Sequence, residues 1–99
     1  MNAIELEAKF RELFEKDLAK MRQKNHDYAG NGNDALKNLK RWGSLGVIVR
    51  LSDKYERLEN FFKTGILKVK DESIRDTLLD IRVYGYLAEI LLDEEQAEK

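Results

Sequence analysis

LGVIVRLSDKYERLENFFK, residues 45–63, is the stretch that decides the fold. Its apolar side chains recur every three or four residues, the spacing of one face of an α-helix; they are Leu51, Tyr55, Leu58 and Phe62. Ser44 precedes the run as a candidate N-cap, and Thr64 with Gly65 closes it. The stretch therefore predicts a long helix with one apolar face.

A second long helix follows after a short link, ILKVK, at residues 66–70. Asp71 is a candidate N-cap, and Glu72 is favourable in the first turn. The apolar stripe of this helix is predicted at Ile74, Leu78, Ile81, Gly85, Ala88 and Leu92. Residues 93–99, DEEQAEK, are predicted to form a frayed acidic tail. The short link favours an antiparallel helix pair.

Upstream, residues 3–21 predict another helix, whose apolar stripe contains Leu6, Phe10, Leu13, Phe14, Leu18 and Met21. We expect this helix to break at NHDYAGNGND, residues 25–34, where Gly30, Asn31, Gly32 and Asn33 favour turns. Asp34 or Asn33 is expected to cap a short helix over residues 35–42, which Gly43 ends.

These patterns predict an all-α fold, an antiparallel bundle of three long helices and one short helix in a single domain, residues 1–99. Cysteine is absent and no apolar run reaches the length of a membrane span. The net charge of −1 argues against nucleic acid or a membrane as a partner. A chain of 99 residues has a thin core, which favours a homo-oligomer.

Carboxylates gather on the two helices of the predicted pair. Asp53 and Glu56 are three residues apart, whereas Glu72, Asp76 and Asp80 follow one another at intervals of four. If Lys63 lies level with Asp71 across the link, Asp53 lies level with position 81 and Glu56 with position 78. Four carboxylates, those of Asp53, Glu56, Asp76 and Asp80, are then predicted to converge, with Glu72 nearer the link.

Such a cluster is repulsive unless a cation compensates it, and Mg²⁺ prefers oxygen ligands. The sequence therefore predicts a magnesium site. An alternative needs no metal, because Arg50, Arg57, Arg75 and Arg82 lie at helical spacing from the same acids. In that alternative the charges form ordinary ion pairs on solvated helix faces.

The segments KNHDY (24–28), NLKRWG (38–43), RLSDKYERLENF (50–61) and DESIRDTLLDIRVYGYLAEILL (71–92) resemble the phage-associated family called nucleotide modification associated domain 1. That family is similar to the all-α NTP pyrophosphohydrolases typified by MazG. The resemblance covers residues 20–93. It implies a Mg²⁺-dependent enzyme that cleaves a nucleoside triphosphate to the monophosphate and pyrophosphate.

In the MazG group, Glu-x-x-Glu on one helix and Glu-x-x-Asp on the next bind the metal. Asp53 and Glu56 match the first motif, with Asp in place of the first Glu, and Asp80 matches the end of the second. Thr77 stands where MazG has Glu, and the acid comes one residue earlier, at Asp76. Glu56 and Asp80 are the candidate catalytic residues, since one carboxylate would activate the attacking water.

Residues 24–43 are polar and suit contact with a nucleotide. Asn25 and Asn38 offer amide donors and acceptors to a base, and Tyr28 and Trp42 offer flat rings for stacking. Lys24, Arg50 and Lys54 are the candidate phosphate-neutralising cations. For Trp42 an alternative stays open, in which it covers the core together with Leu39.

Three functions therefore follow from the sequence and the resemblance. The first is the pyrophosphohydrolase, and the second is a nucleotide-binding protein without turnover that sequesters a signal nucleotide. The third is a helical interaction module whose acids are plain surface. The resemblance implies a phage or prophage origin, a cytoplasmic location in a bacterial or phage-infected cell, and a dimer or tetramer.

Overall fold

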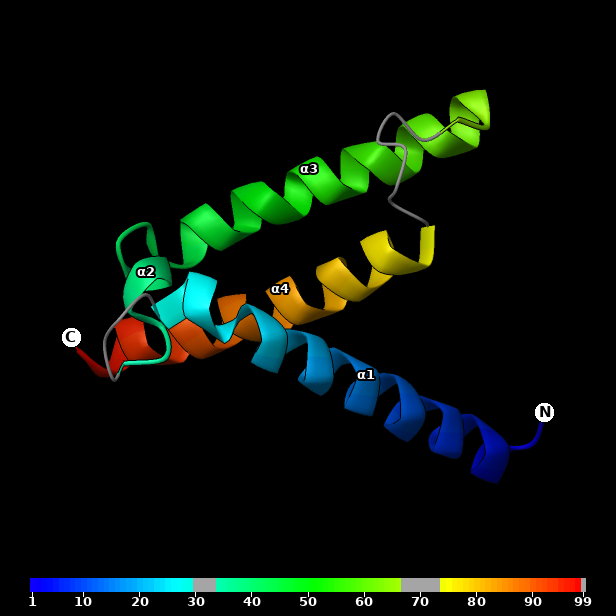
Figure 1. The fold of residues 1–99 in the computed structure, drawn as a ribbon, viewed down its shortest axis with the longest axis horizontal. Helices are drawn as coiled ribbons and strands as arrows, with labels where there is room; N and C mark the ends of the chain where they lie inside the picture. The colour runs from blue at the N-terminus through cyan, green and yellow to red at the C-terminus, as the bar shows by residue number, and fades with distance from the viewer. Residues whose placement is uncertain (30–33, 67–73, 99) are drawn as a thin grey trace.

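The computed structural model describes residues 1–29, 34–66 and 74–98, and it excludes the side chains of residues 26–29. Its elements are helices α1 (Ala3–Ala29), α2 (Lys37–Lys40), α3 (Gly43–Thr64) and α4 (Ile74–Ala97). The prediction of an all-α fold with three long helices and one short helix is thereby confirmed. None of these helices has the length and apolar character that crossing a membrane requires. Figure 1 shows α3 beside α4, while α1 joins them near α2 and diverges toward its N-terminus.

Helices α3 and α4 form the predicted antiparallel pair. Ser44 near the start of α3 contacts Glu95 near the end of α4, and Lys54 contacts Asp80 further along. The second contact has the register that the link predicted. Gly65 ends α3 in a left-handed conformation, with φ of 73°, and its N–H donates to the Phe61 carbonyl. Because other residues resist that conformation, the prediction that Gly65 closes the helix has a clear steric basis.

The apolar faces predicted for α3 and α4 are right only in part: Ala88 is buried as predicted, but several members of each stripe are exposed. Tyr55 and Phe62 are 61% and 78% exposed, and Leu78 and Leu92 are each 41% exposed. The buried core instead contains Leu39, Val47, Val83, Leu87, Ala88 and Leu91. Polar residues share this face, because Thr77 and Asp80 of α4 are also buried. A stripe assigned from apolar residues alone therefore misses the true interface.

Helix α1 is longer than predicted, since it continues through residues 22–29 rather than breaking at residue 25. Asp17 is 2% exposed and accepts two hydrogen bonds of 2.8 Å from the Arg82 guanidinium. The hydrogen bonds raise the pKa of Arg82 above its usual value. This paired, nearly buried carboxylate fastens the C-terminal half of α1 to α4, where Met21 also packs against the core.

The predicted acidic tail is also wrong, because α4 extends to Ala97. The Glu95 carboxylate accepts hydrogen bonds from the Ser44 N–H at 2.7 Å and the Ser44 hydroxyl at 2.8 Å. Trp42, not Ser44, is the N-cap residue of α3, and its side chain makes no capping hydrogen bond. Glu95 therefore caps the N-terminus of α3 from a distant part of the chain, because it accepts a hydrogen bond from a backbone N–H there. The dipole of α3 also favours a negative charge at this end of the helix.

Helix α2 is shorter than predicted, and Gly43 is the first residue of α3. Asp34 accepts a hydrogen bond from the Leu36 N–H at 2.9 Å, just before α2. Lys40 contacts Asp34 at 2.7 Å and Glu94 at 2.9 Å, and these hydrogen bonds raise its pKa. The predicted turn at residues 30–33 and the predicted cap at Asp71 lie outside the described residues.

Candidate functional site

Of the predicted metal ligands that the structure describes, Asp80 alone is buried, and it is only 9% exposed. Its carboxylate lies 2.9 Å from the Lys54 ammonium of α3 and 3.8 Å from the Lys24 ammonium of α1. Asp80 therefore joins three helices through charge, and two predicted substrate-binding cations meet at a predicted catalytic acid.

The other described acids of the predicted cluster face solvent. Asp53 and Glu56 are exposed on α3, and Asp76 is exposed on α4. Within residues 1–29, 34–66 and 74–98, no group of three or more acidic or histidine side chains is placed to hold a metal ion. These residues do not fit a preassembled magnesium site, since Asp80 turns toward the helix interface and its charge is met by lysines. Glu72 lies outside the described residues.

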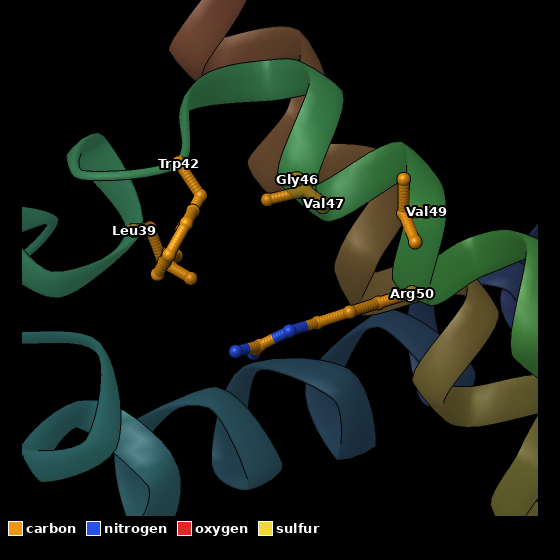
Figure 2. A pocket seen from close by; sticks show the side chains of 6 residues that line it. All are labelled: Leu39, Trp42, Gly46, Val47, Val49 and Arg50. Atoms are coloured by element: carbon orange, nitrogen blue, oxygen red, sulfur yellow. The ribbon is translucent and has the colours of Figure 1, made fainter.

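A hollow of about 320 Å³ lies where α2 meets α3. It is lined by Leu39, Trp42, Gly46, Val47, Val49 and Arg50. Figure 2 shows the Arg50 side chain extending from α3 across the hollow toward α1, with Trp42 and Leu39 on the opposite side. Two predicted substrate-binding residues, Trp42 and Arg50, thus belong to one concave surface.

The structure decides between the two alternatives for Trp42. Leu39 is 4% exposed and belongs to the core, whereas Trp42 is 69% exposed. The Arg41 guanidinium lies 5.8 Å from the centre of the Trp42 ring. Gly46 permits this arrangement, because a Cβ at that position would lie 2.5 Å from the Trp42 Cβ. Trp42 is therefore a surface aromatic held beside the hollow rather than a cover of the core.

The other residues predicted to contact a nucleotide are not among those that line this hollow. Asn38 of α2 and Asn25 of α1 are exposed, and Tyr28 lies in the last turn of α1, where its side chain is outside the described ones. Gly46, Val47 and Val49 of the hollow were not expected from the sequence. Their apolar character resembled that of any helix face, and only the three-dimensional structure shows the hollow.

The site as a whole combines an apolar hollow with cations. Arg50 and Lys54 are four residues apart, so they lie on the same face of α3 and connect the hollow with the Lys54–Asp80–Lys24 cluster. Arg50, Lys54 and Lys24 bring three cationic side chains to this part of the protein, and Asp80 contacts two of them. This arrangement suits a flat, partly apolar ligand that carries negative charge.

No protein-family model, curated protein or solved structure matches the chain.

Proposed function

We propose that the protein binds a nucleotide, with the base against Trp42 and the phosphates toward Arg50 and Lys54. The observation that supports this most is the position of Trp42 and Arg50 on one hollow of about 320 Å³. That volume lies at the lower end of the range for small-molecule sites, about 300–1,000 Å³. An exposed indole beside an apolar wall offers a stacking surface, and a guanidinium pairs with phosphate oxygens through two parallel hydrogen bonds.

The lysines give the proposal its electrostatic part. Lys54 contacts Asp80 at 2.9 Å, and Lys24 contacts it at the longer distance of 3.8 Å. A phosphate entering beside them competes with the Asp80 carboxylate for both ammonium groups. Asp80 acts here as a positioning residue, because it holds both lysines near one point before the ligand arrives.

Mg²⁺-dependent hydrolysis of a nucleoside triphosphate is the second candidate, and it carries over the resemblance to the MazG-like enzymes. One observation favours it: Asp53, Glu56 and Asp76 are exposed, so a nucleotide-bound metal has access to them. Mg²⁺ commonly binds one or two carboxylates together with substrate phosphates. Binding without turnover stands first, because the described acids form no preassembled metal site.

The test is thermal unfolding with a panel of nucleotides, with and without Mg²⁺, followed by chromatography of each ligand. A ligand at 100 times its dissociation constant adds about 2.7 kcal/mol to the unfolding free energy. A nucleotide that stabilises the protein and returns intact supports the binding function. A return as monophosphate plus pyrophosphate, only with Mg²⁺, supports the enzyme.

Variants locate the site. We expect Trp42→Leu and Arg50→Gln to remove most of the ligand-induced shift while leaving the melting temperature of the free protein nearly unchanged, since both side chains are exposed. Arg11→Gln, on the distant half of α1, is the matched control and should keep the shift. If no nucleotide raises the melting temperature of the wild-type protein, the proposal is wrong. Separately from nucleotide binding, we propose the homo-oligomer, a dimer or tetramer, that the sequence predicts.

A further inference from the structure

The apolar stripe of α1 passes from covered to uncovered along its length. In the C-terminal half, Leu18 and Met21 are partly buried, and Asp17 is paired with Arg82 of α4. In the N-terminal half, Leu6, Phe10 and Leu13 are 50%, 68% and 40% exposed. Figure 1 shows this half of α1 diverging from the other helices. The described chain therefore covers only part of a continuous stripe.

Helix α4 extends the uncovered surface beyond α1. Phe14 meets Tyr86 edge to face, with 6.0 Å between the ring centres, yet Phe14 remains 45% exposed and Tyr86 46% exposed. Beside them a hollow of about 440 Å³ opens between α1 and α4, and Ile90 lines it. We call this continuous set the α1–α4 apolar surface; its members are Leu6, Phe10, Leu13, Phe14, Tyr86 and Ile90.

The single chain exposes more area than a compact monomer of its size. Its accessible surface is 7710 Å² for 11.6 kDa, whereas a compact protein of that mass exposes about 5,800 Å². Its radius of gyration is 15.4 Å, compared with about 13 Å for a compact domain of this length. The open arrangement of α1 leaves surface that a second chain can cover.

Charge near the surface favours a near-neutral partner. Along the N-terminal half of α1, Lys9 pairs with Glu12 at 3.2 Å, and Arg11 pairs with Glu7 at 2.5 Å. Positive and negative side chains alternate there, and the whole chain carries a net charge of only −1. Two copies can therefore meet without marked electrostatic repulsion, whereas a strongly charged polymer would not be attracted electrostatically.

We propose that a second copy of this chain docks on the α1–α4 apolar surface, so that the two protomers cover one another through the same patch. Six large side chains that are 40–68% exposed offer at most roughly 440–740 Å² per protomer, if each is given the roughly 150–250 Å² that a fully buried aromatic side chain removes. A stable interface buries about 800 Å² per partner. With the flanking polar residues, the surface reaches the area that a two-fold symmetric dimer needs. The inference is independent of nucleotide binding.

The test is the mass of the protein in solution, by sedimentation equilibrium over a dilution series. We expect wild type to have twice the chain mass of 11.6 kDa. Phe10→Asp places a charge at the most exposed member of the surface, and we expect it to weaken association by more than about tenfold. Arg11→Asp, one residue along the same helix but outside the stripe, is the control and should remain a dimer.

Far-ultraviolet circular dichroism of both variants should match wild type, because Phe10 and Arg11 are exposed in the single chain and neither substitution leaves a buried cavity. A monomeric wild type overturns the inference and leaves the surface to a different protein. A Phe10→Asp variant that stays as dimeric as the control also overturns it, because association then uses another face.

Discussion

Replacing Asp80 with Asn distinguishes an acid paired with lysines from an acid in a repulsive carboxylate cluster. The Asp80 side chain is 12% exposed, and that of Lys54, at 2.9 Å, is 16% exposed. Lys24, at 3.8 Å, is more open, with 32% exposure. Asn keeps the shape of the residue but removes the negative charge that both ammonium groups contact.

The magnitude follows from this burial. Breaking a fully buried ion pair costs about 3–5 kcal/mol, and breaking an exposed pair costs about 0–1 kcal/mol. Because the Lys54 contact is mostly buried and the Lys24 ammonium is about one third exposed, we expect a loss of about 3 kcal/mol in unfolding free energy. For a domain of this length that corresponds to a fall of at least about 10 °C in melting temperature.

The assay is thermal and urea unfolding of wild type, Asp80→Asn and Asp53→Asn without added metal. Asp53→Asn is the matched control, since it makes the same chemical change at an exposed position of α3 and should alter stability by less than about 0.5 kcal/mol. An increase in the melting temperature of Asp80→Asn would mean that carboxylate repulsion dominates. Equal effects of the two substitutions would show that the lysine contacts contribute little, and either result would refute the reasoning.

Three further changes test other contacts. Glu95→Ala removes two hydrogen bonds at the start of α3, and we expect urea denaturation to show a loss of about 2 kcal/mol; no loss would disprove the distant cap. Gly46→Ala places a Cβ 2.5 Å from that of Trp42. It should therefore lower the free energy of unfolding by about 1–3 kcal/mol and change the tryptophan fluorescence spectrum. An unchanged spectrum would show that the ring has room for the added methyl group. The hydrogen bond from Lys40 lowers the pKa of Asp34 below 3.8, so its stabilisation is present above pH 3.8 and is lost as pH falls through the lowered value. Lys40→Met should therefore be less stable than wild type near pH 7, and the gap in urea midpoint should shrink as pH falls below 3.8 and through the lowered pKa. A gap that stays equal over this range would contradict the reasoning.

The sequence predicts the helices of this fold better than it predicts their faces. Apolar spacing and Gly65 place α3 to within two residues at each end, and the short link orients α4. The faces are wrong in part because charged residues occupy positions in the interface. Lys54 and Asp80 stabilise each other between α3 and α4, and a search for apolar periodicity passes over both.

The candidate site shows the same limit. The sequence selects Trp42, Arg50, Lys54, Lys24 and Asp80, and the structure brings the first two into one hollow and the last three into one cluster. The sequence does not show that an exposed acid such as Asp53 and a buried acid such as Asp80 point in different directions. That difference depends on the rotation of each helix about its axis. Helical spacing alone fixes this rotation only to within about one residue position.

The contact between Ser44 and Glu95 also bears on the order in which the protein folds. It joins residues 51 positions apart, so during translation α3 emerges from the ribosome long before the carboxylate that secures its first turn. Local pairing of α3 with the beginning of α4 comes early, because its loop is short, whereas the distant contact requires most of the chain to be synthesised. Since Trp42 directly precedes that first turn, the hollow beside it takes its final shape late. Newly made chains should therefore acquire their helices before the hollow beside Trp42 is fully formed.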